Sequence, residues 1–365
     1  MSEEARGAAG RWTAGQAWDW MRARPWICGF NYLPSVAVNF VETWHRDSFA
    51  PEVIARELGW AEDIGYTALR INLPFIVWQN DAAGLQKRMN QFLQIASQNG
   101  LSVIFCLFDD CEFSGEPARY GPQPDPIPGI HNSRAVASPG RATVMDPDAR
   151  PALGAYVRNI LSAFRDDPRV LMWDLYNEPG NRMIFRSGRY ESYPDALIPA
   201  SAALMRQAFV WAREIGPTQP LSVGAWSAPA DGSSAYSTGI DIEAIALSDI
   251  VTFHAYVPAA RLKVLIGQLA EQGRPMICTE WMARSLGSRI EDQLEIFRAA
   301  GVGAIQWGLV RGRTQTYLPW PDGVSGGGGA LSAAEWFHDL LDEEGHACSA
   351  RELDVLQSVL KSKIS

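Results

Sequence analysis

The chain has 365 residues, of which 47% are hydrophobic and 20% are charged, and this composition excludes disordered and fibrous classes of protein. Its 32 basic and 41 acidic residues give a net charge of −9, which disfavours nucleic acid and anionic membranes as partners. Fourteen tryptophans are many for this length, and indole rings stack well on the C–H faces of sugar rings.

The N-terminal residues and the cysteines bear on location. Residues 1–26 are charged and lack the apolar stretch of a signal peptide, and no apolar run approaches the roughly 18 residues of a membrane span. The cysteines are odd in number and dispersed: Cys28, Cys106, Cys111, Cys278 and Cys348. This pattern favours reduced thiols over disulfides. We therefore expect a cytoplasmic protein.

Eight short apolar runs predict strands, which begin near Trp26, Thr67, Leu101, Val170, Leu221, Ile250, Pro275 and Gly303. The runs are continuous and do not alternate with polar residues, as is typical of parallel strands covered on both faces. Amphipathic patterns between them predict helices over 51–64, 82–99, 148–166, 201–215, 240–247, 259–272 and 289–300, with a last helix over 350–361. Four of these patterns stop at a glycine, a common helix terminator.

Eight strands that alternate with helices predict an α/β fold, specifically a (β/α)8 TIM barrel. A doubly wound open sheet uses the same alternation, but no glycine-rich phosphate loop follows the first strand. We predict an N-terminal segment (1–25), a barrel domain (26–345) and a C-terminal helix or tail (346–365). Extended loops after strand 3 (111–147) and strand 8 (with SGGGGA at 325–330) lie on the face where barrels carry active sites, so we expect them to wall a pocket.

Two acidic residues end predicted strands. Glu178 ends the strand-4 run VLMWDLYNEP, and Glu280 ends the strand-7 run PMICTEW. In an eight-stranded barrel, strands 4 and 7 lie across the mouth from each other, so these carboxylates can face each other over one bound ring. This is the arrangement that glycosidic cleavage needs.

The motifs around this pair resemble those of the retaining β-glycosidases of the cellulase-like (β/α)8-barrel clan. The resemblance spans about residues 26–308. It rests on Asn177-Glu178-Pro179, Thr279-Glu280-Trp281, Arg70 in LRINLP, His254 and Tyr256 in FHAY, and Trp307. It implies that Glu178, after strand 4, is the general acid/base and that Glu280, after strand 7, is the nucleophile of a double displacement.

The same resemblance implies roles for residues around the pair. Arg70 would hold Glu280 as the anion, and Tyr256 would donate its phenol to the same carboxylate. The remaining residues would orient a carboxylate or bind the sugar: Asn177 at the 2-hydroxyl, His254 beside one of the two acids, Trp307 as a platform under the ring, and Trp281 beside the nucleophile.

The end of strand 3 departs from the family pattern. Cellulase-like relatives usually offer a histidine there, whereas this chain has FDDCEF. We expect Asp109 to bind sugar hydroxyls in its place, and His131, from the following insertion, to join the substrate-binding set. The acidic residues Asp109, Asp110 and Glu112 are also an alternative site for a hard cation, but we predict no metal and no cofactor.

Structural alternatives exist for each of these residues. Glu178 is also suited to the N-terminus of a helix opened by Pro179, and Arg70 is suited to pairing with a structural acid. His254, Tyr256 and Trp307 are alternatively core residues. Four more tryptophans at strand ends are equally core fillers or sugar platforms: Trp44, Trp78, Trp226 and Trp320.

We therefore expect a glycoside hydrolase that cleaves β-glycosidic bonds of a gluco- or xylo-configured oligosaccharide or small glycoside. A mannosidase or transglycosylase with the same carboxylate pair is the alternative within enzymes. A carbohydrate-binding barrel without turnover is the alternative from another class, although such a protein has no need of the full set of catalytic residues. None of these patterns specifies the oligomeric state.

Overall fold

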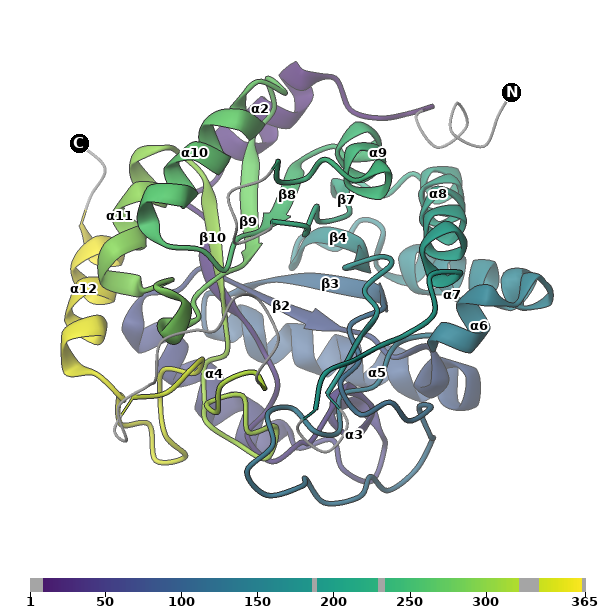
Figure 1. Cartoon of the computed structure of the whole chain (residues 1–365), viewed down its shortest axis with the longest axis horizontal. Coiled ribbons are helices and arrows are strands. Elements are labelled where there is room, and N and C mark those ends of the chain that lie inside the picture. Colours follow the sequence, from purple (N-terminus) through teal and green to yellow (C-terminus); the bar gives the residue numbers. More distant parts are fainter. Residues whose placement is uncertain (1–8, 186–188, 229–233, 322–334, 363–365) are drawn as a thin grey trace.

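The computed structural model describes residues 9–185, 189–228, 234–321 and 335–362, and its centre is a parallel barrel surrounded by helices (Figure 1). The barrel strands are β1 (Cys28–Asn31), β2 (Ala68–Asn72), β3 (Ser102–Asp109), β4 (Val170–Asn177), β7 (Leu221–Ser222), β8 (Val251–His254), β9 (Met276–Glu280) and β10 (Gly303–Trp307). Their hydrogen-bonded order is β7-β4-β3-β2-β1-β10-β9-β8. A parallel bridge between Ala225 and Phe253 joins the two end strands. The predicted TIM barrel is confirmed, and the open-sheet alternative is wrong.

Helices connect successive strands and cover the outside of the barrel. They are α4 (Pro51–Ile64), α5 (Phe75–Gln98), α7 (Arg150–Phe164), α8 (Leu197–Ile215), α9 (Gly239–Leu247), α10 (Ala259–Ala270) and α11 (Ile290–Ala299). Helix α8 ends at Gly216, which has the left-handed φ of 59° that favours glycine. Within the described residues, no helix is both long and apolar enough to cross a membrane.

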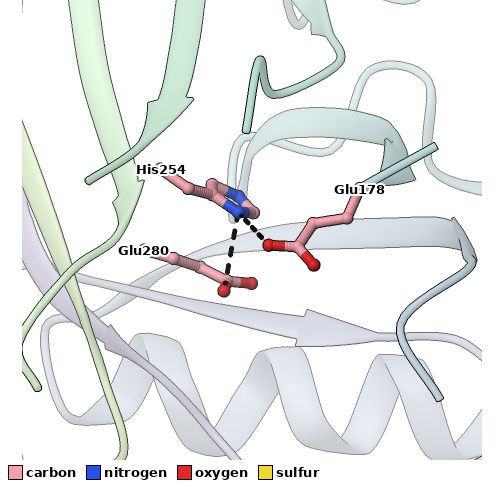
Figure 2. A group of neighbouring side chains, drawn as sticks. All are labelled: Glu178, His254 and Glu280. Carbon is pink, nitrogen blue, oxygen red and sulfur yellow. Dashed lines mark hydrogen bonds and ion pairs between the residues drawn. The ribbon is translucent and has the colours of Figure 1, made fainter. Parts of the chain in front are cut away.

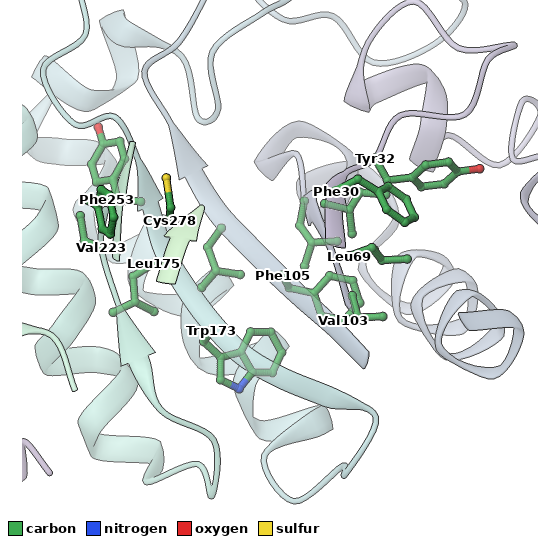
Figure 3. Packing of buried hydrophobic residues seen from close by; sticks show 14 of the residues in the cluster. Phe30, Tyr32, Leu69, Val103, Phe105, Trp173, Leu175, Val223, Phe253 and Cys278 are labelled. Atoms are coloured by element: carbon green, nitrogen blue, oxygen red, sulfur yellow. The ribbon is translucent and has the colours of Figure 1, made fainter. Parts of the chain in front are cut away.

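Alternation along the strands divides the barrel into an outer apolar layer and an inner core. Leu69 and Ile71 of β2 point outward into the large cluster between strands and helices, with Phe105 and Trp173 of β3 and β4 (Figure 3). Arg70, between the two β2 residues, points into the barrel, because successive side chains on a strand face opposite sides. The interior is therefore available to polar groups near the mouth.

Helices near the two ends of the chain pack on the barrel. In α2 (Ala14–Arg22), Ala17 and Trp20 close the starts of the strands in a second apolar cluster with Ile27, Ala68, Ile104, Leu171, Met172, Ile250, Ile277 and Ile305. Helix α12 (Ala350–Lys361) contacts α4 and α11. Carboxylate oxygens of its Glu352 accept bonds from Arg284 at 2.7 and 2.8 Å. The predicted boundaries at residues 25 and 345 stay predictions.

Loops build up the opposite face, at the carboxyl ends of the strands. The insertion after β3 contains α6 (Arg141–Met145) and the 3-10 helix η1 (Pro147–Ala149). Further short elements there are α3 (Phe40–Trp44), the hairpin β5 (Met183–Ile184) and β6 (Glu191–Ser192), and the 3-10 helix η3 (Arg284–Leu286). The glycine-rich stretch 325–330, predicted to belong to the strand-8 loop, lies outside the described residues.

Candidate active site

A cavity of about 660 Å³ opens at the carboxyl ends of the barrel strands. The lining includes most of the residues that the sequence predicts for the site: Arg70, Asp109, His131, Asn177, Glu178, His254, Tyr256, Glu280 and Trp307. These side chains come from six barrel strands or the loops after them, and the cavity falls within the roughly 300–1,000 Å³ typical of small-ligand sites.

Glu280 is the last residue of β9, and two proton donors hold its carboxylate. Arg70 Nη1 lies 3.0 Å from Oε1, and the Tyr256 hydroxyl donates to Oε2 at 2.8 Å. Arg70 is buried and also bonds Asp174, with Nε 2.8 Å from Oδ2. Arg70 was predicted either to hold Glu280 or to pair with a structural acid. It does both at once.

Glu178 directly follows β4 and has a backbone φ of 45°, a left-handed value that is strained for a residue with a side chain. The Asn181 amide donates to Oε2 at 2.5 Å, and His254 Nδ1 lies 2.8 Å from Oε1. Residues 178–185 contain turns and the strand β5 but no helix, so Glu178 does not start a helix and that alternative is wrong.

The two carboxylates face each other with His254 between them (Figure 2). One donor atom each of Glu178, His254 and Glu280 lies within 4.8 Å of the other two. An oxygen of one carboxylate thus lies within 4.8 Å of an oxygen of the other, which favours the short separation of retaining glycosidases, roughly 5–5.5 Å, over the roughly 6.5–9.5 Å of inverting ones.

Burial shifts the ionisation of all three groups. It raises the pKa of Glu178 above the ordinary 4.5, while the bond from Asn181 acts in the opposite direction. It also raises the pKa of Glu280, with Glu178 adding to the rise and Arg70 and Tyr256 opposing it. Burial lowers the pKa of His254 to about 4, so this ring is neutral at neutral pH. Arg70 lowers the pKa of both carboxyl groups, but it bonds Glu280 directly, whereas Asn181 and His254, which bond Glu178, are neutral.

Asn177, the last residue of β4, is held at both ends of its amide. Its Oδ1 accepts from Arg70 Nη2 at 2.7 Å, and its Nδ2 donates to Asp109 Oδ1 at 2.8 Å. Asp109 also accepts from Asn72 at Oδ2 and from the Cys111 backbone N–H at Oδ1. Asp109 lies in the cavity as expected, but both of its oxygens already accept from the protein, from Asn72, Cys111 and Asn177.

Tryptophan and histidine rings form one side of the cavity. Trp307, at the end of β10, lies 5.8 Å from the His338 ring centroid at an interplanar angle of 17°. His131 lies in the cavity wall, with Nδ1 2.6 Å from the Leu318 carbonyl oxygen. Trp226 and Trp320 also line the cavity, whereas Trp44 is fully buried with its indole N–H on the Asn72 carbonyl.

Trp281 does not belong to this wall. It is fully buried, its ring lies 5.0 Å from the Phe297 ring of α11, and it is absent from the described lining of the cavity. The expectation that Trp281 contacts substrate is wrong, because it follows Glu280 at the end of β9 and projects to the opposite face.

Two sets of side chains at the predicted site are possible metal ligands. Glu178, His254 and Glu280 have donor atoms close enough for an ion, but Arg70 and Tyr256 already bond the Glu280 carboxylate. Of the acidic residues after β3, Asp110 accepts bonds from Tyr176, Gly180 and Ser201, and Asp109 holds Asn177. The Asp110 and Asp109 oxygens are thus committed to different protein donors and do not form a common cation site.

Several residues of the site were not predicted from the sequence. Asn31 and Asn72 end β1 and β2, a position that is typical of barrel active-site residues, and this signal was available in the strings GFNYL and LRINLP. Asn181 lies three residues after Glu178, and no sequence motif identifies it as a site residue. His338 comes after the long strand-8 loop, where spacing along the chain predicts no contact.

Comparison with known proteins places this barrel in a class. The family model described as Cellulase (glycosyl hydrolase family 5) matches residues 60–310, and the fold and the carboxylate pair agree with it. The protein is a glycoside hydrolase. The chain belongs to glycosyl hydrolase family 5, a family of retaining β-glycosidases. No curated protein matches the chain.

Solved structures share the fold at low sequence identity. A GH5_18 variant from Streptomyces cattleya in complex with Manβ1-4GlcNAc is 15% identical, with 92% of this chain and 80% of that chain covered and a TM-score of 0.61. The exo-β-1,4-mannosidase Op5Man5 from Opitutaceae bacterium strain TAV5 is 17% identical (93% and 59% covered, TM-score 0.60). The endo-1,4-β-mannanase from Rhizomucor miehei is 13% identical (92% and 95% covered, TM-score 0.58).

Proposed function

We propose that this enzyme hydrolyses β-glycosidic bonds of short oligosaccharides or small glycosides by double displacement, with Glu178 as acid/base and Glu280 as nucleophile. The observation that carries the assignment is the different surroundings of two facing carboxylates. Arg70 and Tyr256 donate to Glu280 and favour its ionised form. Asn181 and the neutral His254 contact Glu178, which suits a group that must carry a proton before the reaction.

In the first step, a Glu280 carboxylate oxygen attacks the anomeric carbon, and the bond from that carbon to the leaving oxygen breaks. Glu178 gives its proton to the leaving oxygen, so the aglycone departs as a neutral alcohol. In the second step, Glu178, now ionised, takes a proton from water, and the water oxygen attacks the anomeric carbon. The ester bond to Glu280 breaks, which restores both residues and leaves the anomeric configuration unchanged.

Asn177 is suited to stabilise the transition state. One N–H of its Nδ2 goes to Asp109, and an amide nitrogen carries two. The second N–H is available to the 2-hydroxyl of the sugar, an interaction that strengthens as the ring becomes oxocarbenium-like. Because Arg70 and Asp109 hold both ends of the amide, its orientation is set before substrate binds.

The configuration of the glycone has two candidates. We propose a manno-configured glycone first, because the similar solved structures include a complex with Manβ1-4GlcNAc, an exo-β-1,4-mannosidase and an endo-1,4-β-mannanase. The gluco or xylo configuration that the sequence favours is the second candidate, and the description of the family model as Cellulase supports it.

Nitrophenyl β-mannoside, β-glucoside and β-xyloside, followed by proton NMR during hydrolysis, test the proposal. We expect cleavage of at least one of them, with the β-anomer of the free sugar appearing before mutarotation. We expect the mannoside to be cleaved fastest. The Glu280→Gln variant is the control for contaminating activity. First appearance of the α-anomer contradicts double displacement, and cleavage of none of the three contradicts the proposed function.

A further inference from the structure

Two loops from distant parts of the chain join into one wall of the cavity. Residues 127–132 belong to the insertion after β3, and residues 314–318 follow β10. Gln315 Nε2 donates to the Ile127 carbonyl at 2.7 Å, the Gly129 backbone N–H donates to Gln315 Oε1 at 2.9 Å, and the Asn132 backbone N–H donates to the Thr314 carbonyl at 2.8 Å. Since β3, β2, β1 and β10 are consecutive in the barrel, this wall spans the mouth above β1 and β2.

Two histidines on this side of the cavity have defined protonation. His131 Nδ1 lies 2.6 Å from the Leu318 carbonyl oxygen, and His338 Nδ1 lies 2.6 Å from the Met282 carbonyl oxygen. A carbonyl only accepts, so Nδ1 carries the hydrogen in both rings. Burial lowers the pKa of His131 to about 4 and lowers that of His338 well below its usual value. Each neutral ring therefore presents Nε2 as a hydrogen-bond acceptor.

One of these acceptors lies beside Trp307, the predicted sugar platform. Both rings line the cavity, their centroids are 5.6 Å apart, and neither Nε2 is among the enclosed, unpartnered polar atoms of the described residues. The His338 ring is nearly parallel to Trp307, and its centroid is 5.7 Å from that of Tyr256, the donor to Glu280. The pair therefore borders the part of the cavity next to the nucleophile.

Asn132 supplies an independent sign of a ligand at this wall. Its side chain lines the cavity and is 7% exposed, and its Oδ1 is enclosed without a hydrogen-bond partner among the described residues. An enclosed amide oxygen is costly unless a donor reaches it. A bound sugar carries several adjacent hydroxyls, which supply donors to the two Nε2 atoms, and a rotation of the Asn132 side chain toward the cavity that it lines brings its oxygen to the same hydroxyls.

We infer that His131, Asn132 and His338 bind the hydroxyl groups of the sugar at the non-reducing end, and that the wall of residues 127–132 and 314–318 restricts the enzyme to removing terminal sugars. The inference rests on the proposed function, because it assigns this end of the cavity to the glycone. An internal sugar carries a further residue in place of one of these hydroxyls. It therefore loses a donor and collides with the wall.

Calorimetric binding to the Glu280→Gln variant tests this without requiring turnover. The probes are mannobiose and cellobiose, each free and with its non-reducing 4-hydroxyl methylated. We expect the free form of at least one disaccharide to bind, and its methylated form to bind at least tenfold more weakly. Equal affinities for the two forms, or binding of neither disaccharide, overturn the inference.

His131→Ala and His338→Ala, made in the same background, test the assigned contacts. Each should weaken binding of the free disaccharide about fivefold to tenfold, and His346→Ala, which changes an exposed histidine of the C-terminal region, should leave it unchanged. The 4-deoxy and 6-deoxy analogues each lack one hydroxyl. The analogue that lacks the hydroxyl bound by a given histidine should bind more weakly than the free disaccharide to Glu280→Gln, but no more weakly than it to the variant that also lacks that histidine. Fully additive losses with both analogues indicate a purely structural role and overturn the contact.

Product analysis separates the two proposals. With the wild-type enzyme and mannotetraose or cellotetraose, terminal action releases monosaccharide and the trisaccharide first. Release of disaccharide from the interior overturns the inference while leaving the proposed β-glycosidase function intact. Terminal-sugar binding without cleavage of any β-glycoside overturns the proposed function and leaves the assigned wall intact.

Discussion

Arg70 organises the polar interior of the barrel, because its guanidinium reaches four side chains. It bonds Asn31, Asp174, Asn177 and Glu280 at 2.7–3.0 Å. One buried cation thereby stabilises the ionised form of Glu280 and orients the amide of Asn177. The identity of Arg70 was predictable from its motif on β2, whereas its shared use by Asp174 and Asn31 was not, because those contacts connect strands that are distant in the sequence.

The Glu178→Ala variant tests the assignment of Glu178 as the acid/base. Loss of a general acid should slow cleavage of a glycoside with a poor leaving group by about 10²–10⁴-fold, and much less with a leaving group that needs no proton. Azide fits the space left by the carboxylate and needs no base, so it should restore turnover and give the β-glycosyl azide. Unchanged activity in the variant contradicts the role, and Glu343→Ala, at an exposed glutamate, is the matched control.

The pH profile follows from the raised carboxyl pKa values. Cleavage needs Glu280 ionised, so kcat/KM should fall as pH decreases through the pKa of Glu280. It needs Glu178 protonated, so kcat/KM should also fall as pH rises through the pKa of Glu178, which burial places above 4.5. In Glu178→Gln the second fall should disappear, because the amide does not titrate. A basic limb that is identical in this variant contradicts the assignment.

The elements themselves were largely predictable because strands and helices in a barrel have different apolar patterns. Helix α4 matches its predicted range, and α12 matches its own. Helix α5 was expected from residue 82 and instead begins at Phe75, with a break at Asp81 where φ is −153°. The segment before the break is short, and it packs Phe75 against Trp78 and Tyr156, a tertiary contact that periodicity along the chain does not reveal.

Strand alternation also explains why one site residue was predicted wrongly. Glu280 and Trp281 are adjacent in the sequence, and a motif treats them as one unit. At the end of a strand they project to opposite sides, so Glu280 enters the cavity while Trp281 packs on Phe297. The reverse case is His338, which is remote in sequence yet stacks beside Trp307.

Helix α12 is held to the barrel by a buried ion pair, and this contact makes a stability prediction. Arg284 and Glu352 are each about 2% exposed, and Arg284 also bonds the carbonyls of Trp336, His338 and Asp339. Glu352→Ala leaves the Arg284 charge without its carboxylate, so we expect the free energy of unfolding to fall by about 3–5 kcal/mol. Urea denaturation followed by tryptophan fluorescence measures it. A loss as small as that of Glu343→Ala contradicts the importance of the pair.

The whole molecule combines a barrel that is apolar at the starts of its strands with a polar mouth. Trp20 of α2 closes the apolar end, and the loops after β3 and β10 narrow the other end into a cavity. The carboxylate pair was predictable because β4 and β9, the fourth and seventh strands of the barrel, lie across the mouth from each other in a closed eight-stranded barrel. The wall of residues 127–132 and 314–318 was not predictable, because its hydrogen bonds join residues about 185 positions apart in the sequence.

The proposed mechanism requires a covalent intermediate at Glu280. A 2-deoxy-2-fluoro β-glycoside of the preferred sugar, with dinitrophenolate as leaving group, destabilises both transition states but still allows the first step. Mass spectrometry of the intact protein should then show one added fluoroglycosyl group, and peptide mapping should place it on Glu280. Inactivation without a covalent adduct, or an adduct on any other residue, would contradict double displacement through Glu280.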